Sequence, residues 1–400
     1  MTLRYLLALA ATTVVVTGAY AQGTDIKIGV LNDRSGTYSD LSGEGSVVAA
    51  RMAVEDFGAA EKGLNVEVVS ADHQNKPDIA SSIARQWIDE DGVDVIADVP
   101  TSSAALAVSE IVREKDKIFL ISGAAASDLT GEKCSPNTVH WTYDTWSLAH
   151  GTGEAMVGQG GDTWFFLTAD YAFGHALERD TAAVVEASGG EVLGSVSHPF
   201  PGQDFSSFLL QAQGSGAKVI GLANAGADTT NAIKQAHEFG ITQGGQNLAG
   251  LLIFITDVHG LGLETAAGLV LTEAFYWDLN DQTREWSKRF AEKHNGAMPT
   301  MVQAGVYSSV LHYLKAVEAA GTKDSQAVMA KMKEMPSEDP LFGKGEVRQD
   351  GRHVHDMYLF EVKKPDESQG PWDYYKVLAT IPAERAFRPL EEGNCPLVTQ

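Results

Sequence analysis

Residues 93–110, VDVIADVPTSSAALAVSE, join an apolar run directly to an alanine-rich segment with helical spacing. The run 93–99 predicts a buried β-strand, and residues 102–114 predict the helix that follows it. The junction between them, from Val99 to Ser103, carries no charged side chain, histidine or cysteine. A strand that leads straight into a helix in this way is the repeating unit of a parallel α/β sheet.

The same alternation extends outward along the chain. Strands are predicted at 26–32, 64–70, 93–99, 118–122, 163–170, 191–200 and 217–224, and helices at 43–57, 79–90, 102–114, 174–188, 206–213 and 229–239. Helical crossovers between strands indicate parallel pairing, and the pattern restarts after residue 150. We therefore predict two Rossmann-like α/β lobes with parallel central sheets.

The chain is expected to pass between the lobes three times, which gives a three-segment hinge. The crossings are predicted near 141–145, 275–278 and 344–351. This division assigns residues 22–144 and 276–347 to the first lobe and residues 145–275 and 348–387 to the second.

The 400-residue chain has room for two domains, and its acidic balance limits its partners. It carries 30 Lys and Arg against 53 Asp and Glu, for a net charge of −23. Nucleic acid and anionic membrane surfaces would repel such a surface, so we expect neither as a partner. Residues 1–21 combine Arg4, an apolar stretch and Ala19-Tyr20-Ala21, which predicts a cleaved signal peptide and a soluble periplasmic protein.

Cys134 and Cys395 are the two cysteines of the sequence. In an oxidising compartment such a pair is expected to form a disulfide, with two free buried thiols as the alternative. The bond would staple the Pro- and Gly-containing tail 388–400, RPLEEGNCPLVTQ, back near residue 134.

Small, uncharged residues follow two neighbouring strands of the predicted first lobe. Thr101, Ser102 and Ser103 open one helix, and Ser122, Ala124, Ala125 and Ser127 follow the next strand. Ligands of open α/β sheets bind beyond the carboxyl ends of strands, where a helix start offers unpaired N–H groups. These residues predict a carboxylate site. Taken alone, Thr101 or Ser102 could equally be only a helix N-cap.

The matching strand ends of the predicted second lobe bring aromatic and polar residues. Tyr171 and Phe173 stand at one strand–helix junction, and Asn224, Ala225 and Asp228 at another. The two rings predict stacking on an apolar ligand body, or alternatively a cover for the lobe edge.

Signals for catalysis, metals and cofactors are weak. The stretch GTGEAMVG at Gly151 lacks the third glycine of a nucleotide loop, and no G-x-S-x-G elbow occurs. His353 and His355 share a face of a predicted strand, where an exposed strand is a simpler interpretation than a metal site. His73 beside Asp72 lacks a nucleophile. We predict a binding protein rather than an enzyme, with no cofactor and no metal.

An ordered series of motifs covers nearly all of the chain after the predicted signal peptide: IKIGVLNDRSG, GSVVAARMAVEDF, VEVVSADHQNKPDIA, TSSAALAVSEI, ISGAAASDLT, TADYAFGHAL and NAIKQAHEFGI. The series resembles the type I periplasmic solute-binding proteins of the branched-chain amino acid (leucine/isoleucine/valine-binding) group. The resemblance implies hinged lobes that close over one small ligand and deliver it to an inner-membrane ABC permease. It also places the carboxylate on the first-lobe residues named above and the ligand body beside Phe173, Asn224 and Ala225.

The chain departs from the amino-acid binders of that family at one place. They hold the α-ammonium with an acidic residue after a later strand, and the matching place here is Leu251 or Leu252. A leucine cannot pair with a buried ammonium, which is costly to leave unpaired. Asp228 or Asp257 could substitute. The simpler interpretation is a carboxylate ligand without an amine, similar to the benzoates and hydroxycinnamates that the aromatic-acid branch captures. An amino acid or amide binder and a periplasmic ligand sensor remain alternatives, and we expect a monomer.

Overall fold

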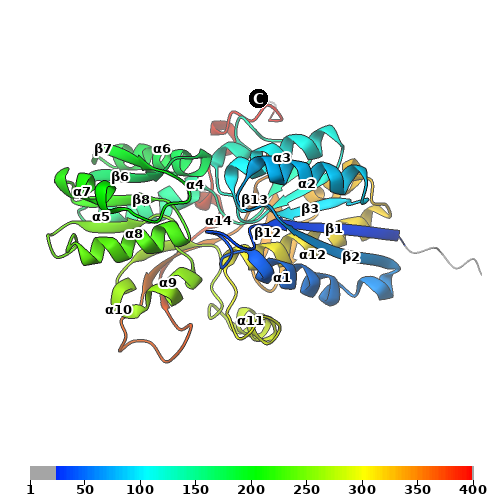
Figure 1. Ribbon diagram of the computed structural model, residues 1–400. Helices are drawn as coiled ribbons and strands as arrows, with labels where there is room; N and C mark the ends of the chain where they lie inside the picture. Colours follow the sequence, from blue (N-terminus) through cyan, green and yellow to red (C-terminus); the bar gives the residue numbers. More distant parts are fainter. Residues whose placement is uncertain (1–23, 399–400) are drawn as a thin grey trace, which may run out of the picture.

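The computed structural model describes residues 24–398 and contains two parallel β-sheets, each in its own lobe, with helices on both faces (Figure 1). The α/β fold with two parallel sheets confirms the predicted fold class. The residue limits of the lobes stay predictions, and the predicted signal peptide lies outside the described residues.

The first lobe is built on a five-stranded parallel sheet in the order β2-β1-β3-β4-β5. Its strands are β1 (Thr24–Asn32), β2 (Leu64–Asp72), β3 (Val95–Asp98), β4 (Ile118–Ile121) and β5 (Thr138–His140). Its helices are α1 (Gly43–Phe57), α2 (Pro77–Asp89), α3 (Ser102–Glu114), α11 (Asp281–Lys293), α12 (Met301–Ala320) and α13 (Ser325–Glu334), with short 3-10 turns η1 (Ala59–Lys62) and η2 (Ser127–Thr130).

Two helix layers cover this sheet. Helices α1 and α12 pack together on one face, and α2 and α3 pack on the other. Helix α12 is apolar around most of its circumference and is buried along its length, as expected for a central helix. Gly45 lets α1 approach α12 closely, because a β-carbon there would lie 2.2 Å from Gln303 Nε2.

The second lobe is built on a four-stranded parallel sheet in the order β7-β6-β8-β9. Its strands are β6 (Thr163–Ala169), β7 (Glu191–His198), β8 (Val219–Ala223) and β9 (Asn247–Gly250). Its helices are α4 (Thr145–Leu148), the π-helical turn η3 (Ala149–Gly153), α5 (Glu154–Gly158), α6 (Ala172–Ala187), α7 (Ser206–Gly214), α8 (Ala227–Glu238), α9 (Ile255–Leu261) and α10 (Leu263–Ala266).

Two small antiparallel sheets form the later part of the chain. One sheet contains β10 (Val270–Glu273), β14 (Met357–Val362) and β15 (Tyr375–Ile381), and the other contains β11 (Ser337–Asp339), β12 (Gly343–Val347) and β13 (His353–Val354). The turns α14 (Ala383–Ala386) and η4 (Leu390–Glu392) complete the described chain. An isolated bridge joins Arg352 to His140 at the end of the first sheet, which keeps this late segment beside the hinge.

The predicted disulfide is present. Cys134 and Cys395 are bonded, and Arg388 Nη2 donates to the carbonyl oxygen of Ser127 at 3.0 Å. These contacts hold the tail against the first lobe, where Figure 1 places the C-terminus.

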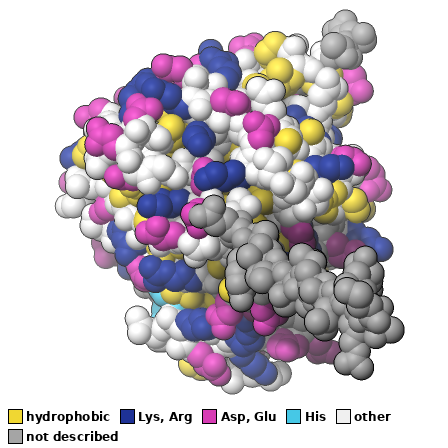
Figure 2. Space-filling view, turned by 90° about the vertical axis from the view of Figure 1, so that its right-hand side faces the viewer, with side chains coloured by type: hydrophobic (Ala, Val, Ile, Leu, Met, Phe, Trp, Pro, Cys, Tyr) yellow, Lys and Arg dark blue, Asp and Glu magenta, His cyan; other side chains and the backbone are white. Residues whose placement is uncertain are grey.

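Charged side chains of both signs share the surface. On the visible part of the first-lobe end, Figure 2 shows basic and acidic side chains interspersed rather than gathered by sign. Among residues 24–398, no helix combines the length and the apolar character that a membrane span needs.

Candidate ligand-binding site

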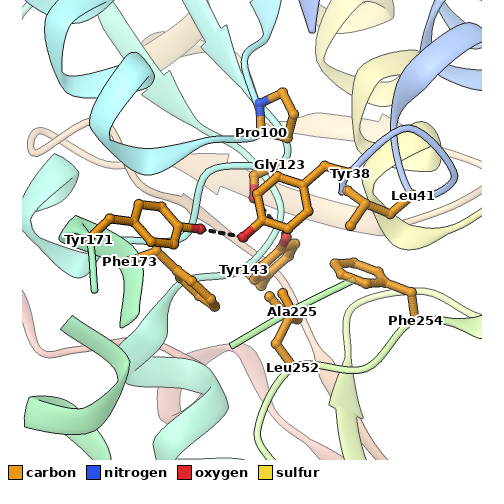
Figure 3. A pocket seen from close by; sticks show the side chains of 10 residues that line it. All are labelled: Tyr38, Leu41, Pro100, Gly123, Tyr143, Tyr171, Phe173, Ala225, Leu252 and Phe254. Atoms are coloured by element: carbon orange, nitrogen blue, oxygen red, sulfur yellow. Dashed lines mark hydrogen bonds between the residues drawn. The ribbon is translucent and has the colours of Figure 1, made fainter. Parts of the chain in front are cut away.

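A small cavity lies between the two lobes at the C-terminal ends of their parallel strands. Ligand sites in open α/β sheets form at this edge. Ten residues line the cavity (Figure 3): Tyr38, Leu41, Pro100, Gly123, Tyr143, Tyr171, Phe173, Ala225, Leu252 and Phe254. The free space amounts to about 10 Å³, far below the roughly 300–1,000 Å³ of drug-sized pockets, so a ligand enters only if the lining side chains or the lobes move apart.

The first lobe supplies half of this lining from the ends of four strands. Tyr38 and Leu41 lie in the loop between β1 and α1, Pro100 follows β3, and Gly123 follows β4. Tyr143 follows β5 in the first hinge segment. A β-carbon at Gly123 would lie 2.7 Å from Pro100 Cβ, so only glycine allows these two loops to meet as they do.

The second lobe supplies the other half in the same way. Tyr171 and Phe173 lie at the start of α6, directly after β6, and Ala225 follows β8. Leu252 and Phe254 follow β9. Both lobes therefore contribute residues from equivalent strand ends, and a ligand in the cavity contacts both.

The lobes touch each other directly beside the cavity. The Tyr38 and Tyr171 hydroxyls share a hydrogen bond, drawn as a dashed line in Figure 3. The ring of Phe200 stacks on Tyr171 with centroids 4.3 Å apart and lies 5.4 Å from Tyr38. The backbone N–H of Ala227 donates to the Thr37 carbonyl oxygen at 3.3 Å. The structure therefore shows the closed arrangement of the lobes.

The cavity is aromatic, and its polar groups are neutral. Burial raises the pKa of the Tyr38, Tyr143 and Tyr171 phenols, so they stay protonated and can donate hydrogen bonds. The Tyr143 hydroxyl donates to the Gly123 carbonyl oxygen at 2.7 Å. None of the ten lining residues is Lys, Arg, His, Asp or Glu. The cavity can therefore hold an aromatic or aliphatic body and bond its polar groups through hydroxyls and backbone.

Of the predicted site residues, Tyr171, Phe173 and Ala225 line the cavity. Thr101 and Ser102 are buried beside it and bond to protein groups. The Thr101 hydroxyl donates to Asn75 Oδ1. Ser102 Oγ accepts from the backbone N–H groups of the two residues after Ala124, each at 3.2 Å. The two amides that could have received a carboxylate therefore already bond to a side chain of the same lobe.

The other predicted first-lobe residues are not among the lining residues of the cavity. Ser103 is half-buried, and Ala124, Ala125 and Ser127 are buried. Ser122 Oγ is buried and has no hydrogen-bond partner among residues 24–398. Ser127 Oγ donates across the cleft to Asp180 Oδ2 at 2.7 Å, which makes a further direct contact between the lobes.

Asn224 and Asp228 bond to groups of their own lobe. The Thr229 hydroxyl donates to Asn224 Oδ1 at 2.6 Å, and Asn224 Nδ2 lies 3.1 Å from His198 Nε2. Asp228 Oδ1 accepts from the backbone N–H of Gly202 at 3.0 Å. Whether the predicted residues bind ligand stays a prediction.

Buried carboxyls lie directly behind the cavity walls. Desolvation raises the pKa of Asp98 to about 6, and it raises the pKa values of Asp228 and Asp257 to about 7 each. Asp257 Oδ2 accepts from the backbone N–H of the lining residue Phe254 at 2.9 Å. Charge near this site therefore depends on the protonation of acids that do not line the cavity.

Sequence reasoning missed Tyr38, Leu41, Pro100, Gly123, Tyr143 and Phe254, and it considered Leu252 only as the place where an acid is missing. Two of them carried a usable signal. Tyr38 is an aromatic residue in the polar loop SGTYSD that follows the first strand, and Tyr143 stands inside a predicted crossing. Aromatic residues at such places would otherwise be exposed, which favours a role at an interface or a ligand.

The paired histidines lie buried at the hinge, not on an exposed strand. The ring of His353 stacks on Trp141 with centroids 3.8 Å apart, and His355 Nε2 lies 2.7 Å from the Thr142 carbonyl oxygen. Within the described chain, no three His, Cys, Asp or Glu side chains gather as metal ligands would. These histidines therefore pack the hinge segments together.

The chain is similar to known proteins over almost its whole length. Residues 25–370 match the family model described as periplasmic binding protein. A periplasmic binding protein from Burkholderia mallei, known from a crystal structure, has 55% sequence identity with this chain and a TM-score of 0.92. The match covers 94% of this chain and 99% of that one.

Two further solved structures extend this similarity. A branched chain amino acid ABC transporter periplasmic ligand-binding protein from Burkholderia xenovorans LB400 is 44% identical, with a TM-score of 0.83 and coverage of 93% and 99%. A solute-binding protein of an ABC transporter from R. palustris, solved in complex with benzoate, is 22% identical, with a TM-score of 0.80 and coverage of 90% and 97%. At 22% identity the last similarity shows the fold alone.

Proposed function

The chain belongs to the periplasmic binding protein family, and we propose that it captures a small aromatic carboxylic acid, of the benzoate or hydroxycinnamate type, for an ABC importer. As a member of this family it is a substrate-binding transport protein of the periplasm, of the branched-chain amino acid type. The inner-membrane permease of the importer is its proposed partner, and we propose that it acts as a monomer.

The aromatic lining is the observation that carries the proposed ligand class. Five of the ten lining residues are Tyr or Phe, and they come from both lobes. Aromatic rings that meet at offset or edge-on angles contribute about 0.5–1.5 kcal/mol beyond the free energy of burying their apolar area. Walls of this kind would pack on the faces of a single substituted benzene ring once the lobes open to admit it.

The absence of an acid from the lining is the second support. Leu252 lines the cavity near the place where amino-acid binders of the family carry their acid. An ammonium in this cavity would have no carboxylate among the ten lining residues, and an unpaired buried charge is costly. A branched-chain amino acid is the second candidate, because Leu41 and Leu252 would pack equally well against an aliphatic side chain.

Closure of the lobes completes the proposed mechanism. The ligand contacts strand ends of both lobes, so it binds the closed form better than the open one and shifts the population toward it. The hydroxyls of Tyr38 and Tyr171 meet only when the lobes are closed. In this proposal the carboxylate bonds to neutral hydroxyls and backbone N–H groups while the ring packs on Phe173 and Phe254.

Isothermal titration of the purified chain with benzoate, 4-hydroxybenzoate and L-leucine tests the proposal. We expect at least one benzoate to bind more tightly than leucine. Phe173→Leu removes a buried ring of the cavity and should weaken benzoate about threefold to tenfold. The matched control Phe239→Leu changes a ring of the same lobe that is 41% exposed and should leave affinity unchanged.

Tighter binding of leucine than of every aromatic acid would contradict the proposed ligand class and favour the second candidate. Equal effects of Phe173→Leu and Phe239→Leu would move the ligand away from the cavity described above.

A further inference from the structure

Three carboxyl groups stand directly behind the cavity walls, and none of them lines the cavity. Asp98, Asp228 and Asp257 are 0%, 1% and 7% exposed. Asp98 Oδ1 would lie 3.2 Å from a β-carbon at the lining residue Gly123. Asp257 bonds to the backbone of Phe254, and Asp228 stands three residues after Ala225. Each acid therefore adjoins a different part of the lining.

The backbone at Asp98 is strained, and the strained conformation places the carboxyl at the edge of the first-lobe sheet that faces the cavity. Asp98 has φ of 80° and Val99 has φ of 52°, and such left-handed values are outliers for a β-branched residue. The strand partner of Asp98 is Leu31, which packs under α2 and α3. The Asp98 carboxyl instead accepts from Ser42 Oγ at 2.6 Å, beside α1 on the opposite face. Strain of this kind concentrates at functional sites.

No cation balances these carboxyls among the groups that face them in residues 24–398. His198 lies 3.8 Å from Asp228, but burial lowers its pKa and keeps it neutral. The groups that face Asp98 are Asn32, Ser42, Ser46 and Tyr143. Those that face Asp228 are His198, Tyr38 and Tyr171. Those that face Asp257 are Asp40, Glu273, Tyr143 and Tyr375.

A carboxylate in the cavity would therefore meet negative charge on several sides. Like charges in a site of low dielectric disfavour each other's ionised form, so one of the partners takes up a proton. The ligand's negative charge adds to desolvation, which already raises the pKa values of Asp98, Asp228 and Asp257 into the range between about 6 and about 7. Proton uptake by the protein is then the easiest way to accommodate the anion.

We propose that this protein binds its carboxylate ligand together with protons from solvent, which neutralise the carboxyls of Asp98, Asp228 and Asp257 behind the cavity. The inference rests on the proposed function, because only an anionic ligand would drive uptake. An ammonium would have the opposite effect and would release protons from the same carboxyls. The protein would then load most readily where the periplasm is acidic.

Calorimetry with benzoate in buffers of different ionisation enthalpy, between about pH 7 and 8, counts the protons directly, since benzoate stays ionised there. We expect net uptake of about one proton and a dissociation constant that falls up to tenfold for each unit decrease in pH. Asp228→Asn and Asp98→Asn should each reduce the uptake. Asp94→Asn is the matched control, because Asp94 lies at the other end of β3 and pairs with Lys323 Nζ at 3.1 Å.

Benzoate binding by the wild-type chain with zero proton uptake and no pH dependence would overturn the inference and leave the proposed function standing. Uptake that persists unchanged in Asp98→Asn, Asp228→Asn and Asp257→Asn would also overturn it. Failure of benzoate to bind at any pH would overturn both the inference and the proposed ligand class.

Discussion

The hydrogen bond between Tyr38 and Tyr171 should contribute to ligand affinity although it lies between two protein groups. The hydroxyls belong to different lobes and meet only in the closed form, with Phe200 stacked on Tyr171 at 4.3 Å. A neutral hydrogen bond contributes a net 0.5–1.5 kcal/mol, whereas a buried hydroxyl left without a partner costs about 1–3 kcal/mol. Tyr38 is 3% exposed, so its hydroxyl cannot regain water when its partner is removed.

We therefore expect Tyr171→Phe to weaken ligand binding by about 1–3 kcal/mol, because it leaves the Tyr38 hydroxyl without a hydrogen-bond partner in the closed form. Tyr38→Phe should have a similar effect, because the burial that raises the pKa of Tyr171 also keeps its hydroxyl from water. The double variant should bind the ligand no more weakly than Tyr171→Phe alone, because removing both hydroxyls leaves no buried hydroxyl without a hydrogen-bond partner. Calorimetric titrations of the four proteins complete a double-mutant cycle.

The coupling between the two substitutions is the informative quantity. Strictly additive losses would mean that each hydroxyl acts on the ligand separately, and the cross-lobe bond would then play no part in closure. Unchanged affinity in both single variants would refute the reasoning altogether.

Three further outcomes are expected. Cys134→Ser with Cys395→Ser should lower the free energy of unfolding by up to about 5 kcal/mol, because the bond joins residues 261 positions apart, and thermal unfolding at an unchanged temperature would contradict this. Gly226→Ala should weaken ligand binding about tenfold or more and also lower stability, because a β-carbon there would lie 2.5 Å from the Thr37 carbonyl oxygen of the other lobe and the φ of 59° favours glycine; the checks are calorimetry for affinity and thermal unfolding for stability. The stability advantage of the wild-type chain over Asp257→Asn should be smaller at pH 8 than at pH 5. The folded-state pKa values of the three buried carboxyls lie at about 6 to 7, above the unfolded value of about 3.9, so their stabilisation is complete below that value and is lost as pH rises through 6 to 7, by about 1.4 kcal/mol per pKa unit and group. A wild-type advantage over Asp257→Asn in urea unfolding that grows from pH 5 to pH 8 would oppose that sign.

The fold was predictable because its signals are local. Each strand and each helix has an apolar period that a short window reveals, and parallel crossovers follow from their alternation. Parallel pairing also places all strand ends at one edge, which is why Phe173 and Ala225 could be identified from the sequence. The disulfide was predictable for a different reason, since a secreted chain with two cysteines has only one pairing.

The polar part of the site was less predictable because it depends on contacts between distant residues. Ser102 is a good candidate for a carboxylate until the fold brings its hydroxyl within 3.2 Å of the Ala125 amide. The hydrogen-bond partner of Tyr38 lies 133 residues away in the sequence, so no local pattern indicates the bond. The left-handed backbone at Asp98 has no glycine to mark it, and the residue reads as an ordinary strand end.

A crystal structure of the chain grown with equal concentrations of 4-hydroxybenzoate and L-leucine tests the central claim most directly. We predict one aromatic ring in the cavity, packed against Phe173 and Phe254, with its carboxylate on hydroxyl or backbone N–H donors. Leucine in the cavity, with its ammonium paired to a side-chain carboxylate, would contradict the account.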